Sequence, residues 1–174
     1  MRVIGGEFRS RRLKTLPGLA LRPTPDRLRE ALFNVLAPRI AGTVFLDAYA
    51  GCGAVGIEAL SRGAARAIFV EKHAGAVRVI QENLAALGLE PRAQVLRGPA
   101  VSLLAKMEAD IVFLDPPYLL VREYAAALAL LGEKPPALAL VQHDKRFRLE
   151  ECYGALHRTR TLVQGENAVS FYLP

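Results

Sequence analysis

Apolar runs and helically spaced segments alternate along the chain from residue 43 onward. The expected strands are the runs TVFLDA, RAIFVE, AQVLRG, DIVFLD and ALALVQ. Segments with apolar residues at helical spacing lie between them, near residues 54–62, 74–87, 100–106 and 121–131. Strands that are apolar along nearly their whole length are buried on both faces, which is typical of a parallel sheet covered by helices. The pattern therefore predicts an α/β fold built from alternating βα units.

The two ends of the chain depart from this alternation. The last two runs, HRTRTLVQ and AVSFYLP, flank the turn GEN and predict an antiparallel hairpin. At the other end, MRVIGG and RSRRLKTL are expected to form short strands around a turn. A helix is expected within residues 22–40, with Thr24 or Asp26 as its N-cap and Pro38 at its end.

Positive charge is concentrated near the N-terminus. Residues 1–30 contain eight basic and three acidic residues, a net charge of +5, while the whole chain carries +6. A basic excess at one end predicts a surface for a polyanion. The alternative is a solvated basic tail without a function, which the expected hairpin disfavours.

Composition narrows the class of protein. A chain of 174 residues with 52% hydrophobic residues suits a single globular domain. It contains no apolar stretch long enough to span a membrane, and its first residues lack the apolar segment of a signal peptide, so we expect a cytoplasmic protein. Cys52 and Cys152 do not have metal-ligand spacing, so we expect free thiols and no metal site.

A glycine-rich loop, AGCGAVG, follows the first expected strand. Its glycines at 51, 53 and 56 have the G-x-G-x-x-G spacing, which fits NAD, FAD or S-adenosylmethionine. Glu71, at the end of the second strand, can accept hydrogen bonds from both hydroxyls of the ribose that each of these three cofactors contains. Asp47 directly before the loop would be unfavourable beside a pyrophosphate but favourable beside a sulfonium or an ammonium group. This favours S-adenosylmethionine, unless Asp47 only caps the turn, and the C-terminal hairpin argues against a dehydrogenase fold.

The motif DPPY, residues 115–118, follows the fourth expected strand. It resembles the signature of methyltransferases that modify a nitrogen conjugated to a ring or a carbonyl. Such a nitrogen is a poor nucleophile, because its lone pair is delocalised, and acceptors must hold it toward the methyl donor. Asp115 supplies one acceptor and the carbonyl of Pro116 a second, while Pro117 adds rigidity and Tyr118 offers a ring for stacking. These four residues are the expected catalytic motif, with Asp115 also a candidate proton acceptor.

Taken in order, several segments are similar to one family. MRVIGGEFRSRRL, RPTPDRLREALFNVL, LDAYAGCGAVGIEALSRGA, VEK and FLDPPY together resemble the RsmD family, the 16S rRNA guanine-N2 methyltransferases. The resemblance implies a class I methyltransferase fold: Rossmann-like, with a seven-stranded, mostly parallel sheet, a C-terminal antiparallel hairpin and a small N-terminal β-hairpin extension. It divides the chain into the extension, 1–22, and the methyltransferase domain, 23–174. It also implies S-adenosylmethionine as cofactor and methylation of guanine 966 of 16S rRNA within a small-subunit particle.

Site residues follow from the same resemblance. The expected cofactor-binding residues are Asp47, Tyr49, Ala50, Gly51, Gly53, Glu71, Lys72, Gly98 and Ala100. The expected RNA-binding residues are Arg2, Arg9, Arg11, Arg12, Lys14, Arg22, Thr24 and Arg27. The start of the helix at Thr24 and Arg27 suits a donor carboxylate or an RNA phosphate, with plain capping as the alternative. His143 is a further candidate near the substrate, or an ordinary histidine at a strand end.

The chain departs from the family at two places. In the glycine loop this chain has Tyr49 and Cys52 where the family usually has the sequence FAGSG. These changes of side chain leave the role of the backbone intact. Pro99 stands where many relatives carry an acidic or amide residue that meets the adenine amine, so packing and the Ala100 N–H are expected to hold the adenine. Three alternative functions stay open. DNA adenine-N6 and protein glutamine methyltransferases use a similar D/N-P-P-Y/F motif, and a non-catalytic RNA-binding module could have the same fold. A monomer is expected.

Overall fold

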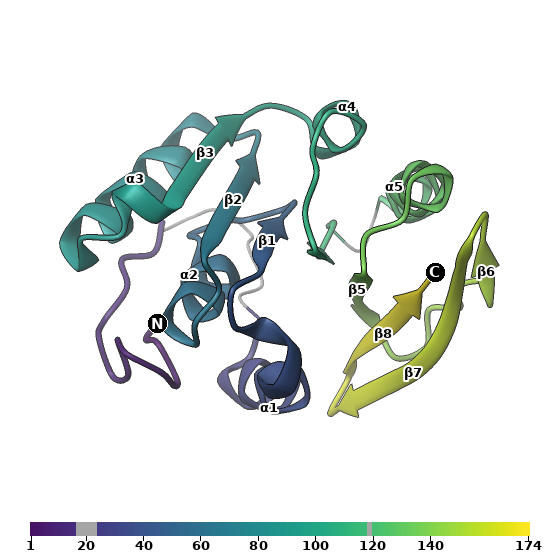
Figure 1. Cartoon of the computed structure of the whole chain (residues 1–174), viewed down its shortest axis with the longest axis horizontal. Helices are drawn as coiled ribbons and strands as arrows, with labels where there is room; N and C mark the ends of the chain where they lie inside the picture. Colours follow the sequence, from purple (N-terminus) through teal and green to yellow (C-terminus); the bar gives the residue numbers. More distant parts are fainter. Residues whose placement is uncertain (17–23, 118–119) are drawn as a thin grey trace.

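The structure, a computed structural model, describes residues 1–16, 24–117 and 120–174 (Figure 1). The strands are β1 (Val44–Asp47), β2 (Arg66–Glu71), β3 (Ala93–Arg97), β4 (Ile111–Leu114), β5 (Leu138–Asp144), β6 (Cys152–Tyr153), β7 (Leu156–Gln164) and β8 (Asn167–Leu173). The helices are α1 (Asp26–Ile40), α2 (Ala54–Ser61), α3 (Ala74–Leu87), α4 (Ala100–Leu104) and α5 (Val121–Glu133), with a 3₁₀ turn η1 (Glu90–Arg92).

All the strands lie in one sheet, in the order β3-β2-β1-β4-β5-β8-β7-β6. Strands β1 to β5 are parallel, β8 runs antiparallel to β5, and β7 pairs with β8 as the predicted hairpin. The α/β prediction is confirmed. The sheet of the described residues has eight strands instead of seven, because the two-residue β6 adds to its edge beside β7. A strand of two residues is too short to show a period in the sequence.

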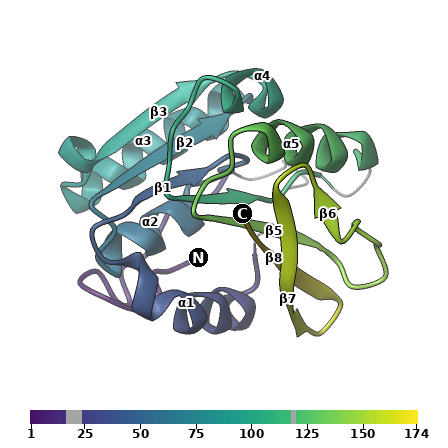
Figure 2. The same cartoon turned by 45° about the vertical axis from the view of Figure 1, so that its right-hand side comes forward.

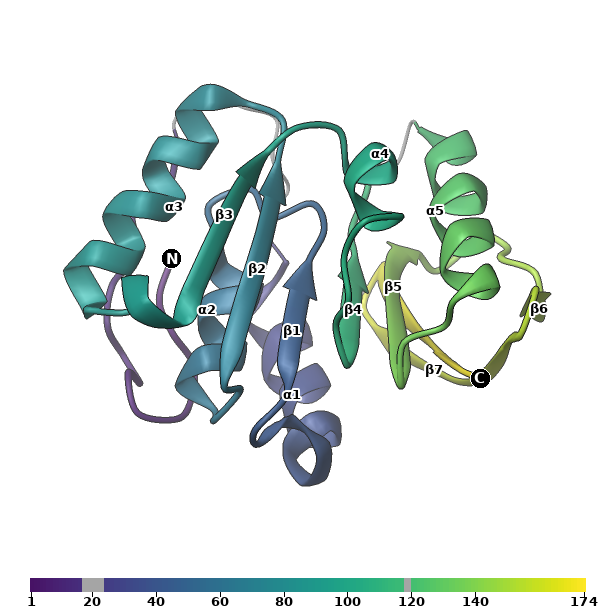
Figure 3. The ribbon, with the colours of Figure 1, turned by 45° about the horizontal axis from the view of Figure 1, so that its top comes forward.

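Helices cover both faces of the sheet (Figures 2 and 3). Helices α1, α2 and α3 lie on one face, and α4 and α5 lie on the other. Neighbouring residues of β1 show the division: Phe45 packs with the apolar residues of α1, while Leu46 packs with those of α5. Because the central strands are covered on both sides, they are apolar throughout, as the sequence pattern indicates.

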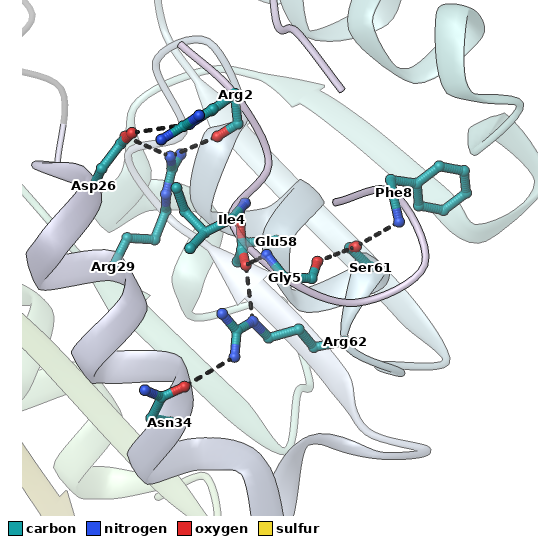
Figure 4. Close-up of polar contacts among 10 residues, drawn as sticks. All are labelled: Arg2, Ile4, Gly5, Phe8, Asp26, Arg29, Asn34, Glu58, Ser61 and Arg62. Carbon is teal, nitrogen blue, oxygen red and sulfur yellow. Dashed lines mark hydrogen bonds and ion pairs between the residues drawn. The ribbon is translucent and has the colours of Figure 1, made fainter. Parts of the chain in front are cut away.

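The N-terminal segment, residues 1–16, is docked on α2 (Figure 4). The buried carboxylate of Glu58 accepts the N–H groups of Ile4 and Gly5, each at 2.8 Å, and the Ser61 hydroxyl accepts the N–H of Phe8 at 2.9 Å. Gly6 has a φ of +76°, and a Cβ there would lie 1.9 Å from the Ser61 carbonyl oxygen. The segment therefore cannot approach α2 so closely with another residue at this position.

The two expected N-terminal strands are reduced to one bridge. Arg2 pairs with Arg12, and the segment turns back between them, but neither side forms a regular strand. No regular strand forms because backbone N–H groups that a β-ladder would use donate instead to Glu58 and Ser61 of α2. The prediction of two short strands was wrong in this respect, although the chain does fold back on itself.

Both predicted boundaries of α1 were wrong. The helix begins at Asp26 with Pro25 as its N-cap, and no side chain caps it. Thr24 is buried and its hydroxyl donates to the Gln142 side chain at 3.0 Å, so it is not free to cap. Pro38 lies inside the last turn, and the helix continues to Ile40 because this side chain, 2% exposed, packs in the core beneath α1. One lost backbone bond near a helix end is offset by that burial.

Within the described ranges, no helix combines the length and apolar character needed to cross a lipid bilayer. The same residues contain no cluster of three or more histidine, cysteine or carboxylate side chains suited to a metal ion. Cys52 and Cys152 are both free thiols.

Candidate active site

Three carboxylates meet at the carboxyl edge of the sheet. Asp47, the last residue of β1, pairs in register with Phe69 of β2 and Phe113 of β4. Glu71 and Asp115 follow these two partners by two residues each, so they extend the edge on both sides of Asp47. The order of the sheet reverses between β1 and β4, which is the position where open α/β sheets bind ligands.

Glycines shape the loop between β1 and α2. Gly51 and Gly53 have φ values of +56° and +83°, a conformation that favours glycine. Gly56 serves a different purpose, because a Cβ there would lie 2.3 Å from the Phe69 ring. The first two glycines thus turn the backbone, and the third lets α2 pack directly on β2.

Asp47 supports the loop and carries an unusual pKa. Its side chain is 1% exposed and accepts the N–H of Gly56 at 3.0 Å. It therefore does cap α2, which was the alternative interpretation from the sequence. Burial, with a smaller contribution from the charge of Glu71, raises the pKa of Asp47 from 3.8 to about 7, against the lowering effect of the Gly56 N–H. A cationic group placed beside this carboxyl would stabilise its charged form.

This pKa predicts how stability depends on pH. Because the native carboxyl of Asp47 retains a proton that the unfolded chain releases near pH 4, its contribution to the free energy of unfolding is full at low pH and falls as pH rises to about 7. Relative to Asp47→Asn, which keeps an acceptor for the Gly56 N–H, the free energy of unfolding of the wild type should fall by a few kcal/mol between about pH 4 and pH 7. Denaturant unfolding at a series of pH values measures it, and a constant difference would contradict the assignment.

Glu71 is held by the loop it faces. Its two carboxylate oxygens accept the N–H of Gly51 and the N–H of His73, each at 2.9 Å. Each oxygen has a second lone pair, so the carboxylate can accept two more hydrogen bonds, the number that a ribose diol offers. The carbonyl of Glu71 accepts the N–H of Gly98, which brings the end of β3 to the same edge.

The remaining expected cofactor residues are distributed around this edge. Lys72 is exposed, Ala50 and Ala100 are buried, and Pro99 is the N-cap of α4, with Ala100 as the first helical residue. Tyr49 is half-buried, and its hydroxyl donates to the Glu123 carboxylate of α5 at 2.7 Å. Burial and this carboxylate raise the pKa of Tyr49. Tyr49 therefore connects the glycine loop to α5.

The DPPY motif begins directly after β4. Asp115 keeps part of its surface exposed, while Pro116 is buried and Pro117 is exposed; Tyr118 lies outside the described residues. Desolvation, followed by the negative charge of Asp47, raises the pKa of Asp115 well above its usual value. The Pro116 carbonyl accepts a hydrogen bond from the Tyr124 hydroxyl at 3.2 Å. The motif therefore places a carboxyl with a raised pKa, and a carbonyl held by a hydrogen bond, at the same edge of the sheet as Asp47.

Asn83 is a site residue that the sequence analysis missed. Its side chain, 2% exposed on α3, donates to the carbonyls of Cys52 and Lys14 and accepts the Lys14 N–H. It joins the glycine loop to the N-terminal segment, and Met1 also contacts Cys52. A polar residue on the apolar face of a helix was the signal. Glu58, among apolar neighbours in α2, gives the same signal.

The expected RNA-binding residues fall into two groups. Arg9, Arg11, Arg12 and Arg27 are exposed, and none has an ion-pair partner among residues 1–16, 24–117 and 120–174. Arg2 lies 3.7 Å from Asp26, and Lys14 pairs with Glu82 at 2.9 Å. Thr24 is buried, so the structure does not present it to RNA, and Arg22 lies outside the described residues.

His143 does not face the surface either. It is 3% exposed and hydrogen-bonds the Ser170 hydroxyl through Nε2 at 2.9 Å. Burial lowers the pKa of its imidazole. These contacts fit the alternative given above, an ordinary histidine at a strand end whose ring is hydrogen-bonded within the fold.

Comparison with known proteins gives consistent relatives. A family described as Conserved hypothetical protein 95 matches residues 1–173. YlbH of Bacillus subtilis (strain 168) is 38% identical over 99% of this chain and 98% of its own length. Ribosomal RNA small subunit methyltransferase D of Escherichia coli (strain K12) is 45% identical over 68% of this chain and 60% of its own length. The solved structure of a hypothetical protein from Thermus thermophilus superposes with a TM-score of 0.82 at 35% identity, covering 98% of each chain.

A more distant structure extends the likeness in fold. The RNA methyltransferase of Salinibacter ruber, solved with S-adenosyl-L-homocysteine, is 18% identical and superposes with a TM-score of 0.68 over 87% of this chain and 94% of its own. The expected class I methyltransferase fold is confirmed, and with it the expectation of S-adenosylmethionine as the cofactor of this class. From its motifs, its fold and these relatives, the chain belongs to the family described as Conserved hypothetical protein 95, the RsmD family.

Proposed function

We propose that this protein transfers a methyl group from S-adenosylmethionine to the exocyclic N2 amine of a guanine in 16S rRNA, the 966-type position, within a small-subunit particle. Methylation of rRNA follows from membership of the family, whose relatives from E. coli and Haemophilus influenzae are named ribosomal RNA small subunit methyltransferase D. The base, the nitrogen and the particle are the proposal. The observation that supports it is that Asp115 and the Pro116 carbonyl follow the strand paired with β1, at the edge where Asp47 accepts the N–H of Gly56 and raises the pKa of Asp115.

The donor site fits a cationic cofactor that carries a ribose. Asp47 and Glu71 are carboxylates on neighbouring strand ends, and the charge of Glu71 raises the pKa of Asp47. A positive group between them relieves this repulsion, which an anionic pyrophosphate would increase. S-adenosylmethionine supplies an electrophilic methyl group on a positively charged sulfur. The Gly51–Gly53 turn brings the backbone close to it, and Glu71 suits the ribose hydroxyls.

The acceptor site suits an amine whose lone pair is delocalised. Asp115 and the carbonyl of Pro116 are two hydrogen-bond acceptors on consecutive residues, and a guanine N2 amine has two N–H donors. Holding both hydrogens directs the nitrogen lone pair away from the ring plane and toward the donor, so catalysis comes from positioning. The raised pKa of Asp115 makes its carboxylate a stronger base than an ordinary aspartate, which suits it to take the proton released after transfer.

The exposed arginines of the N-terminal segment are proposed to hold the RNA. Arg9, Arg11 and Arg12 lie on a segment that is anchored to α2 through Glu58 and Ser61, so their charges are fixed relative to the site. Phosphate contacts of this kind give affinity and orientation without sequence readout. The target base would have to leave its stack to reach Asp115.

Methyl transfer to defined acceptors tests the proposed substrate class. Purified protein and tritium-labelled S-adenosylmethionine are incubated with small-subunit particles from cells that lack the modification, with the corresponding naked 16S rRNA, with duplex DNA and with a ribosomal protein mixture. We expect label in the RNA of the particles and none in DNA or protein. Label in DNA or protein would instead support an adenine-N6 or a glutamine methyltransferase, and no label in any acceptor would support a non-catalytic module.

A further inference from the structure

The first turn of α5 contacts the acceptor motif at its carbonyl. Tyr124 is 2% exposed, and its hydroxyl donates to the Pro116 carbonyl oxygen at 3.2 Å, across a separation of eight residues. The neighbouring Glu123 accepts the hydroxyl of Tyr49 from the glycine loop. Two consecutive residues of α5 thus reach the two loops that carry the acceptor and the donor sites.

The Tyr124 ring is fixed by its packing. It belongs to the core between the sheet and α5, and it packs against the Phe147 ring with 4.9 Å between the ring centroids. Phe147 in turn lies 6.3 Å from the imidazole of His143 on β5. A tyrosine held on its faces in this way has little freedom to move its hydroxyl, so the hydrogen bond to Pro116 has a defined direction.

The direction of the Pro116 carbonyl depends on one dihedral angle. The pyrrolidine ring fixes φ of this residue, and the following Pro117 confines ψ, which turns the carbonyl, to the extended region without fixing it there. The Tyr124 hydroxyl restrains that remaining angle. A carbonyl oxygen has two lone pairs, and Tyr124 uses one; no other donor among the described residues uses the second, which can accept an N–H of the substrate. Prolines alone therefore do not orient this acceptor; proline and tyrosine together do.

We propose that Tyr124 is a positioning residue for methyl transfer, because it orients the Pro116 carbonyl that accepts one hydrogen of the target amine. The inference rests on the proposed function, in which Asp115 and this carbonyl hold the amine. Tyr124 itself touches neither the donor nor the base. Its effect is expected on the rate of the chemical step, and not on the binding of either substrate.

Tyr124→Phe, which keeps the packed ring and removes the hydroxyl, tests this role. We expect kcat for small-subunit particles to fall about tenfold, which corresponds to about 1.4 kcal/mol of activation free energy. The KM for the particles and the Kd for S-adenosylhomocysteine should stay within twofold of the wild type. Tyr172→Phe is the matched control: Tyr172 is fully buried in the same core cluster, and its hydroxyl donates to the carbonyl of Glu150 at 2.7 Å, away from the site.

The outcomes separate positioning from a structural role. A tenfold loss of kcat in Tyr124→Phe, with wild-type kcat in Tyr172→Phe and comparable melting temperatures for the two variants, supports the inference. Equal loss in both variants, an unchanged kcat in Tyr124→Phe, or an effect confined to KM would overturn it. Asp115→Ala is measured alongside. If that variant keeps full activity, the proposed acceptor site itself fails; if it is inactive while Tyr124→Phe is normal, only the role of Tyr124 fails.

Discussion

Asp115→Ala is expected to lower the rate of methyl transfer to small-subunit particles by about a thousandfold. The substitution removes one side chain that both holds the amine and takes its proton, and loss of a positioned proton acceptor costs about 10²–10⁴ in rate. Asp115 is partly exposed and its desolvated carboxyl is disfavoured in its charged form, so the fold should tolerate its loss. Single-turnover kinetics with labelled donor measures the rate, and calorimetry with S-adenosylhomocysteine should give a Kd within threefold of the wild type.

Asp110→Ala is the matched control for this variant. Asp110 is an exposed carboxylate directly before β4, at the end of the strand opposite Asp115, and it accepts the N–H of Val44. The same change of residue type on the same strand, away from the donor loop, should leave the rate at the wild-type level. A rate for Asp115→Ala within tenfold of the wild type would rule out Asp115 as the residue that holds the amine.

Replacing Arg9, Arg11 and Arg12 together by glutamine should weaken RNA binding by between about tenfold and a hundredfold at physiological salt. Three phosphate contacts fewer should also reduce the slope of log K against log salt by roughly 2 to 3. The three side chains are exposed, and the anchoring of their segment depends on backbone amides, so S-adenosylhomocysteine binding should not change. Filter binding of 16S rRNA at several salt concentrations measures both quantities.

Arg39 and Arg66 provide the comparison for this experiment. Both are exposed, at the end of α1 and the start of β2, on the opposite edge of the sheet from the carboxylates. Their replacement by glutamine changes the net charge without touching the N-terminal segment. An equal loss of affinity in this variant would assign the effect to net charge, and an unchanged salt slope in the triple variant would remove the N-terminal segment from the RNA interface.

The strand ends of this protein were predictable from the sequence because they are local features. Asp47, Glu71 and Asp115 each follow a short apolar run, and parallel strands bring their carboxyl ends to one edge of the sheet. The alternation of strands and helices is a property of short windows, and the family resemblance covered the same motifs. The mostly parallel sheet and the C-terminal hairpin followed from both, whereas the order of the strands was not predicted.

The contacts that the sequence did not reveal are long-range. Glu58 and Asn83 bind backbone groups of the N-terminal segment 53 to 69 residues away. Nothing near either residue indicates such a partner. The same limit applies to Tyr124, whose role depends on where its hydroxyl ends after α5 packs on the sheet. Pro38 shows the converse: a strong local rule for ending a helix gave way to the tertiary burial of Ile40.

Together these contacts suggest why the N-terminal segment and the donor loop are built as one unit. Asn83 bonds to both Lys14 and Cys52, so the segment that carries the exposed arginines is fixed to the glycine loop, the proposed cofactor-binding loop. In the proposed complex, RNA bound by these arginines would therefore lie at a defined distance from the methyl donor. Because the segment is already anchored, it avoids the loss of conformational entropy that a free basic tail would undergo when it binds RNA.

The most direct test of the account is the identity of the methylated nucleoside. Small-subunit particles that lack the modification are treated with wild-type protein or with Asp115→Ala, and their 16S rRNA is digested and analysed by mass spectrometry, first as nucleosides and then as mapped fragments. We expect one N2-methylguanosine in a single fragment after wild-type treatment, and none after treatment with the variant. Methylation on another base or another atom, or N2-methylguanosine formed equally by Asp115→Ala, would contradict the account.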